Sequence, residues 1–133
     1  MNYWLVKSEP TVYPWSKFVK DKKAVWDGVR SYPGRKNLRE MAKGDQVLFY
    51  HSMEGLEVVG IAEVINPAYQ DPTTEDDWSV VDLKPVNALK NPVSLKAIRE
   101  VKKLQNIYLI RQGRLSVMPL QKAEFDLIVA MGS

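Results

Sequence analysis

The chain has 133 residues, of which 45% are hydrophobic and 26% are charged, and its formal net charge is +3 at pH 7. This length suits one domain and the hydrophobic content suits a packed core, so we expect residues 1–133 to form a single domain. Because the chain has no cysteine, one histidine and no phosphate-binding glycine motif, disulfides and a standard zinc site are excluded, and we expect neither a metal ion nor a cofactor.

The first half of the chain is predicted to alternate short strands with short helices. Alternating apolar residues end at Ser8-Glu9-Pro10, where the proline interrupts a strand. Apolar residues at helical spacing follow Pro14, and a second helical pattern ends before Gly44. The expected elements are strands over 2–7 and 46–51 and helices over 14–20 and 35–43.

The second half is predicted to be richer in strands. A run of valine and isoleucine has Gly60 in its middle, where glycine usually marks a bulge or a bend that closes a barrel. A polar loop over 66–77 follows, and Ser94 is placed to cap a short helix. The expected elements are strands over 56–65 and 78–86 and helices over 95–99 and 124–131. Five or six strands with short helices between them favour a small mixed barrel.

No part of the sequence predicts a membrane-bound or secreted protein. The first ten residues lack the basic region and long apolar run of a signal peptide. No apolar stretch approaches the roughly 20 residues that a membrane-spanning helix requires. We therefore expect a soluble cytoplasmic protein without a membrane partner.

Basic, aromatic and small polar residues are concentrated between Trp26 and Ser52. Four cations lie within the nine residues 35–43 and are opposed only by Glu40. A site that reads a nucleobase needs an aromatic face for stacking, small polar groups for the base edge, and cations for the phosphates. The stretch therefore predicts one wall of a pocket for a flat, polar, nucleobase-like ligand.

The same residues also have simpler interpretations. Trp26 follows two apolar residues and suits the core, His51 suits a structural role at a strand end, and a basic helix face is ordinarily solvated. The alternative function is an enzyme that uses His51 as a base, oriented by Asp27 or Asp45. The adjacent Ser52 cannot be its nucleophile, because neighbouring side chains on a strand point to opposite faces. A protein-interaction module is a third alternative.

Motifs along nearly the whole chain match, in order and spacing, those of a known family. They are YWLVKSEP at 3–10, WDGVRSY at 26–32, NLREM at 37–41, FYHS at 49–52, GIAEV at 60–64, PVSL at 92–95 and RLSV at 114–117. In these motifs the sequence resembles the EVE domain, a member of the PUA-like superfamily. The resemblance implies an α+β, mainly β, fold, a PUA-like pseudo-barrel of about five or six strands with short peripheral helices.

The resemblance also implies a function. An EVE domain is expected to be a non-enzymatic module that binds DNA or RNA and reads a modified base, such as a 5-methylcytosine derivative. The chain is also similar to the YTH domain, which cages a methylated adenine, and this similarity points to Ser8 and Glu9 for polar contacts and to Trp26 for stacking. One run, Ser31-Tyr32-Pro33-Gly34, stands where the family has an amide-containing run, so the choice of ligand is most open there.

These observations give one predicted site. The base pocket is predicted to consist of Ser8, Glu9, Trp26, Ser31, Tyr32, His51, Ser52 and Ser116. The phosphate contacts are predicted to come from Lys7, Arg30, Arg35, Arg39 and Arg114. The assignment requires that Ser8, Trp26 and His51 line one concave pocket.

Overall fold

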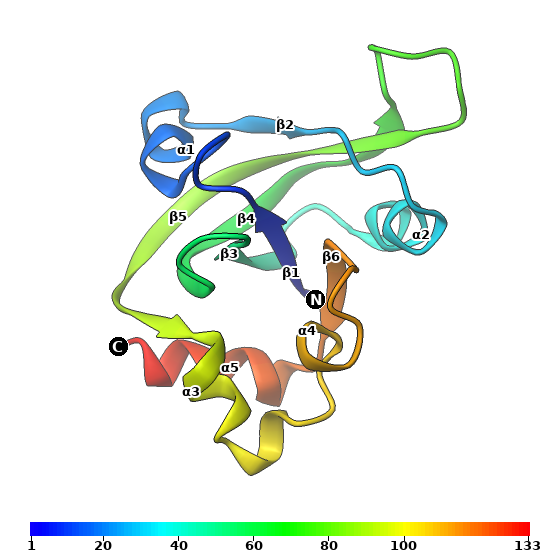
Figure 1. Ribbon diagram of the computed structural model, residues 1–133. Coiled ribbons are helices and arrows are strands. Elements are labelled where there is room, and N and C mark those ends of the chain that lie inside the picture. Colours follow the sequence, from blue (N-terminus) through cyan, green and yellow to red (C-terminus); the bar gives the residue numbers. More distant parts are fainter.

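The computed structural model describes residues 1–133 and is organised around one mixed sheet of six strands (Figure 1). The strands are β1 (Tyr3–Ser8), β2 (Ala24–Trp26), β3 (Gln46–His51), β4 (Glu57–Gln70), β5 (Ser79–Ser94) and β6 (Val117–Leu120). Their order in the sheet is β2-β5-β4-β3-β1-β6, with β1 and β3 parallel and every other pair antiparallel. The long strands β4 and β5 bend strongly, so the sheet curls into a pseudo-barrel whose end strands β2 and β6 do not pair.

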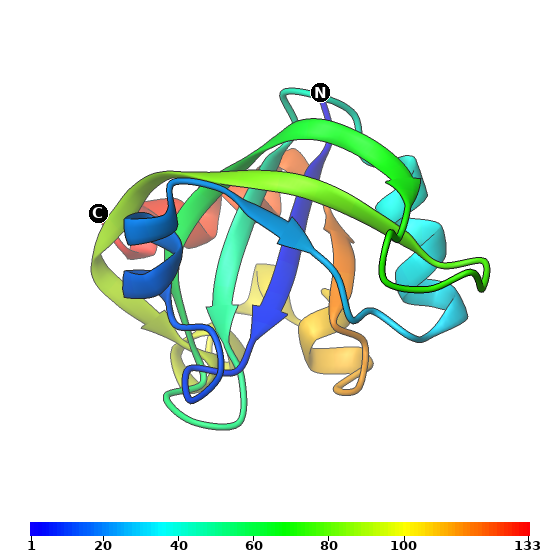
Figure 2. The same ribbon diagram turned by 90° about the horizontal axis from the view of Figure 1, so that it is seen from above.

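Short helices surround this curved sheet. They are α1 (Trp15–Asp21), α2 (Tyr32–Glu40), α3 (Leu95–Arg99), α4 (Tyr108–Arg111) and α5 (Lys122–Met131), with a 3-10 turn η1 at Lys102–Leu104. Helices α3, α4 and α5 gather at the bottom of Figure 1, whereas α1 and α2 lie toward the other side of the sheet. Figure 2 shows the sheet from above, with α1 and α2 at its two ends. The expected mainly β, PUA-like pseudo-barrel with peripheral helices is confirmed.

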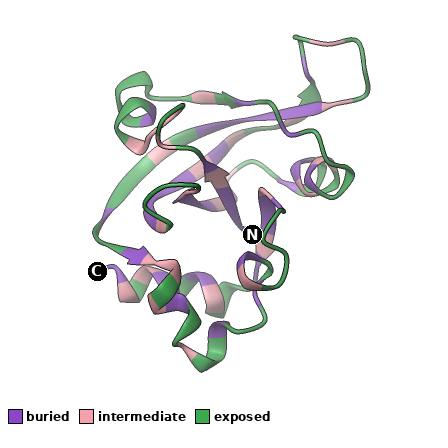
Figure 3. Cartoon of the chain, viewed as in Figure 1, coloured by how far each residue is buried: buried purple, intermediate pink, exposed green.

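The sheet has a hydrophobic core on each of its faces. On the central strand β3, Leu48 and Tyr50 pack toward α3, α4 and α5, whereas Val47 and Phe49 pack toward α1, α2 and β2. Burial on both faces explains why this strand is a nearly continuous apolar run instead of an alternating one. Figure 3 shows the buried central strands between helices that are exposed on their outer sides. No helix in the structure is long and apolar enough to cross a membrane.

Gly60 lies at a break in the strand register, as the sequence predicted. The pairing of β4 with β5 shifts between Val58 and Gly60. A Cβ atom at Gly60 would lie 2.5 Å from the ring of Trp15, so only glycine leaves room for that ring. Trp15 is the first residue of α1, and the missing side chain at Gly60 thus lets the helix approach the sheet closely.

The structure corrects the predicted bounds of one helix and two strands. The helix expected over 35–43 runs from Tyr32 to Glu40, because Ser31 accepts a hydrogen bond from the Gly34 amide and caps it, with a proline in the first turn. Met41 is already extended, so Gly44 belongs to the turn before β3. Strand β4 continues to Gln70, which removes the first five residues of the predicted polar loop over 66–77, and β5 continues from Ser79 to Ser94 instead of ending at residue 86.

Candidate functional site

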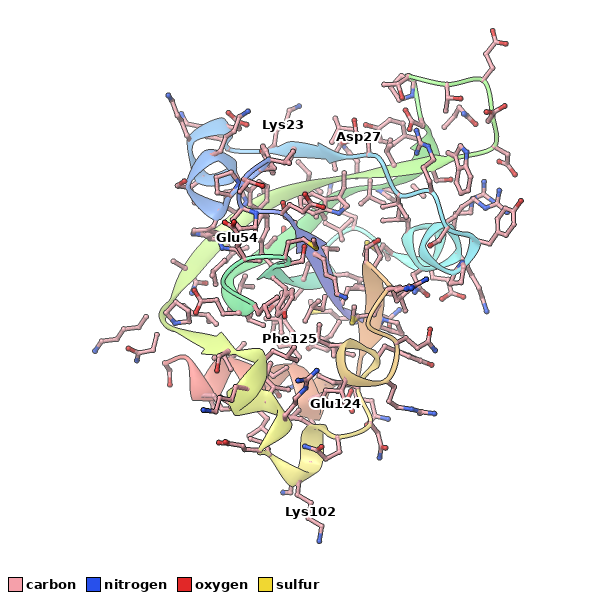
Figure 4. All side chains as sticks on the ribbon, viewed as in Figure 1. Lys23, Asp27, Glu54, Lys102, Glu124 and Phe125 are labelled. Carbon is pink, nitrogen blue, oxygen red and sulfur yellow. The ribbon has the colours of Figure 1, made fainter.

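A cavity of about 790 Å³ opens where the end of β1 meets α1 and β2. Its volume lies within the range of about 300–1,000 Å³ that is usual for small-molecule sites. The wall is formed by Lys7, Ser8, Glu9, Val12, Tyr13, Lys17, Asp21, residues 23–29 and Ser116. Lys23 and Asp27, labelled in Figure 4, lie at the two ends of β2. The cavity therefore combines the YWLVKSEP and WDGVRSY motifs, which are far apart in the sequence.

Hydrogen bonds fold the chain after β1 into the turn that forms one side of the cavity. The carbonyl of Glu9 accepts from the amides of Val12 and Tyr13, and the Ser8 hydroxyl donates to the Tyr13 carbonyl. The Ser8 carbonyl in turn accepts from the amide of Ser52. The side chain of Ser8 is thus engaged in holding the turn, and the exposed carboxylate of Glu9 remains at the cavity.

The aromatic part of the wall is an edge of a larger aromatic cluster. Trp26 is only 8% exposed and packs edge-on against Tyr13, Phe18 and Phe49, with ring centroids 6.3, 6.3 and 5.6 Å away. Trp26 therefore belongs to the core and to the cavity wall at once. Tyr13 is more exposed than Trp26 and also lines the cavity.

The ionisable groups of the cavity are mixed in sign. Lysines 7, 17 and 23 share the wall with Glu9, Asp21 and Asp27. The Lys7 ammonium donates to the carbonyl of Gly113 at 2.7 Å, and burial lowers the pKa of Lys7. Burial and a hydrogen bond to Asp21 raise the pKa of Tyr13 to about 12, so this phenol stays neutral at physiological pH.

Three of the four arginines predicted to bind phosphate are engaged by an acidic loop, residues 71–78. Arg30 donates to Asp71 at 2.9 Å, and Arg35 and Arg39 both contact Asp77. The Asp71 side chain is fully covered, and hydrogen bonds from the Thr73 hydroxyl and amide, followed by Arg30, lower the pKa of Asp71. These ion pairs connect α2 and the segment before it to the β4–β5 loop.

The structure brings part of the predicted site together. Residues from the prediction that line the cavity are Lys7, Ser8, Glu9, Trp26 and Ser116. Residues from the prediction that lie outside its wall are Ser31, Tyr32, His51, Ser52, Arg30, Arg35, Arg39 and Arg114. Ser8 and Trp26 therefore meet the required geometry, and His51 does not, because its imidazole faces the start of α1.

The comparison with known proteins places the chain in a family. The family pattern of the EVE domain matches residues 2–131. The chain belongs to the EVE domain family. Mouse thymocyte nuclear protein 1 is 34% identical over 98% of this EVE domain and 73% of the mouse protein.

Solved structures agree with this assignment. Protein Atu2648 from Agrobacterium tumefaciens is 42% identical, with a TM-score of 0.96 over 100% of this chain and 94% of the other. Human THYN1 protein in complex with 5-methylcytosine-containing DNA is 27% identical, with a TM-score of 0.90 over 100% of this chain and 98% of the other. The fold of the EVE domain is thus kept across distant organisms.

Several cavity residues of this EVE domain were not predicted from the sequence. Tyr13, Lys17, Lys23 and Asp27 line the cavity but were not among the predicted site residues, and Asp27 was considered only as a partner of His51 in the alternative enzyme. The only sequence signal for Tyr13 was an aromatic residue in a segment bounded by two prolines. Gly28 has a φ of +77°, which suits a turn after Asp27, but nothing local showed that Asp27 would line the cavity.

His51 caps the first helix of the EVE domain. Its Nε2 atom accepts a hydrogen bond of 3.0 Å from the amide of Trp15, the first residue of α1. The residue before the helix, Pro14, provides no side-chain cap, so this amide has no other side-chain partner at the helix start. Burial lowers the pKa of His51 below 6.5, although Glu57 opposes the shift.

We expect His51 to make the stability of the domain depend on pH. Since the folded-state pKa lies below the unfolded value of 6.5, the contribution is fully present above pH 6.5 and is lost as the pH falls through the folded pKa. His51→Ala should cost about 1 kcal/mol at pH 8, because the Trp15 amide loses its acceptor. Urea denaturation at pH 8 and pH 5 should show the gap between wild type and variant closing at the lower pH. An equal gap at both would contradict the capping role.

Proposed function

We propose that this EVE domain binds nucleic acid and holds one base, a modified cytosine such as a 5-methylcytosine derivative, in the cavity between β1, α1 and β2. The observation that carries the proposal is the composition of this cavity, where aromatic rings, carboxylates and lysines line one wall. The proposal is supported by human THYN1 protein, a relative of the same fold that is solved with 5-methylcytosine-containing DNA.

The groups in the cavity suit a cytosine ring. Tyr13 and Trp26 both line the wall, and stacking of a base on an exposed aromatic ring contributes about 1–3 kcal/mol. The exocyclic amino group of cytosine is a donor, and carboxylates are its preferred partners in proteins. The exposed carboxylates of Glu9 and Asp27 belong to none of the five ion pairs of the chain, so both are available as acceptors.

Phosphate contacts are proposed to come from the lysines of the cavity. Lys7, Lys17 and Lys23 line the wall, whereas the arginines at 30, 35 and 39 are paired with Asp71 and Asp77. Cations at the border of a base pocket fix the position of the sugar–phosphate backbone of the nucleic acid, and the groups inside the pocket read the base. A base must leave the duplex stack to enter such a pocket, or be single-stranded from the start.

The alternative of an enzyme that uses His51 is less well supported. A general base needs a free lone pair within reach of the substrate. The Nε2 lone pair of His51 accepts the Trp15 amide, and His51 does not line the cavity. Incubating the domain with the oligonucleotides described below and analysing them by mass spectrometry tests this point, since a changed base would favour the enzyme.

The proposal predicts that modified cytosine is preferred and that the affinity for every cytosine form depends on the carboxylates that accept from its amino group. Oligonucleotides that differ only in one cytosine, unmodified, 5-methylated or 5-hydroxymethylated, are measured by fluorescence anisotropy in single- and double-stranded form. We expect the modified forms to bind more tightly. Glu9→Gln or Asp27→Asn should weaken binding by about 1–3 kcal/mol. The variant side chain has one accepting oxygen instead of two, and its NH2 group cannot accept from the amino group of the base. Glu75→Gln, which makes the same charge change on an exposed loop residue, is the control.

The salt dependence of the affinity separates the contribution of the phosphate contacts from that of the base contacts. The logarithm of the affinity should fall with the logarithm of the salt concentration, with a slope near −0.7 per phosphate contact on a single strand. A shallow slope would contradict phosphate binding by the lysines. If both carboxylate variants bound as tightly as the wild type, Glu9 and Asp27 would have no role in reading the base. The absence of binding to every oligonucleotide at low salt would overturn the proposed function as a whole.

A further inference from the structure

An exposed aromatic pair lies outside the cavity, between α2 and the β4–β5 loop. The rings of Tyr32 and Trp78 are stacked, with their planes 15° apart and their centroids separated by 5.9 Å. The guanidinium of Arg35 lies 4.8 Å from the Tyr32 centroid and 5.2 Å from that of Trp78. Tyr32 is 71% exposed, so most of the outer ring remains in water.

The pair is held in place by contacts on both of its sides. Tyr32 is the first residue of α2, whose start is capped by Ser31. Trp78 donates its amide to Asp76 and accepts from the amide of Asp71 through its carbonyl. Figures 1 and 2 agree in placing the β4–β5 loop beside α2. A ring held in one orientation loses little freedom when a ligand stacks on it, and this favours binding.

The chemistry of the pair matches a nucleic-acid stacking surface better than a phosphate site. The arginine nearest both rings is already paired with Asp77, whose side chain is 73% exposed, so a net attraction for phosphate is small here. Aromatic rings with neighbouring guanidinium groups are the surfaces on which proteins stack the bases of single strands, and any base offers a face for this.

The Tyr32–Trp78 pair lies close to the proposed base cavity along the chain. Val29 lines the cavity and Tyr32 follows three residues later, so at most about 11 Å separates their Cα atoms. Stacked bases in one strand repeat every 3.4 Å, so this distance corresponds to a few nucleotides at most. We propose that the Tyr32–Trp78 pair binds a base one to three nucleotides from the base in the cavity. This inference rests on the proposed function, and it makes the bound ligand a single-stranded or locally opened segment.

The test compares a short single strand with the corresponding mononucleotide. The strand carries one 5-methylcytosine in its centre, and Tyr32→Ala should weaken its binding by about 5- to 150-fold, the range expected for one lost stacked base. Binding of 5-methyldeoxycytidine monophosphate, which cannot reach both surfaces, should stay unchanged. Tyr32→Phe keeps the ring and should bind like wild type, and the salt slope should be the same in all three proteins.

Abasic sites identify the contacted nucleotide. Each of the three positions on either side of the modified base is made abasic in turn. In the wild type one of these changes should cost as much as Tyr32→Ala, and in Tyr32→Ala the same change should cost nothing further. If the wild type binds the strand and Tyr32→Ala binds it equally well, or no abasic position is coupled to Tyr32, this inference is wrong while the proposed function stands. If the wild type binds no strand at all, both fail.

Discussion

Asp45→Ala is expected to lower the free energy of unfolding by about 3–5 kcal/mol. The carboxylate of Asp45 is 2% exposed and accepts hydrogen bonds of 3.0 Å from the amide of Asn2, the indole nitrogen of Trp4 and the amide of Ala42. Hydrogen bonds to a charged group contribute about 1.5–3 kcal/mol each, and a buried donor that loses its partner keeps its desolvation cost. Asp45 joins the start of β1 to the turn before β3, and its removal takes the carboxylate acceptor from all three donors.

Urea denaturation followed by circular dichroism measures this loss. Asp45→Asn keeps one oxygen acceptor and should cost about half as much, because its amide nitrogen cannot accept. Asp126→Ala is the control, since it removes a carboxylate from an exposed pair with Lys122 on α5 and should cost less than about 0.5 kcal/mol. A loss below about 1 kcal/mol in Asp45→Ala would show that water or a shifted side chain satisfies the three donors.

Trp26→Ala is expected to affect both the stability and the binding of the domain. The buried ring contacts Tyr13, Phe18 and Phe49, and removing it should cost about 3–5 kcal/mol. The same change removes one side of the proposed base cavity. Loss of binding in this variant alone would therefore not distinguish a missing contact from a loosened fold.

Conservative variants separate the two effects. Trp26→Phe keeps an aromatic ring in the cluster and should remain folded, with a measurable loss of affinity for the modified oligonucleotide. Trp15→Phe is the matched control, because Trp15 packs against Phe18 and Phe49 in the same cluster but does not line the cavity. We expect similar melting temperatures for the two variants and weaker binding only for Trp26→Phe. Equal binding in both would assign Trp26 to the core alone.

The sequence by itself determined most of the local structure of this protein. A continuous apolar run located the central strand β3, Ser94 was recognised as the cap of α3, and Gly60 was recognised as a break in β4. These features depend on residues a few positions apart, so they can be inferred without knowing the fold. The family was also evident, because its motifs keep their order and spacing along the chain.

Only the tertiary structure decided which side chains meet at the candidate site. Arg30 and Asp71 are 41 positions apart, and Trp15 and His51 are 36 apart, yet each pair forms a hydrogen bond that determines the role of both members. Such partners are chosen by the order of strands in the sheet, which brings distant segments together and which local periodicity does not encode. For the same reason Arg30, Arg35 and Arg39 pair with the 71–78 loop, while Tyr13, inconspicuous in the sequence, lies in the cavity wall.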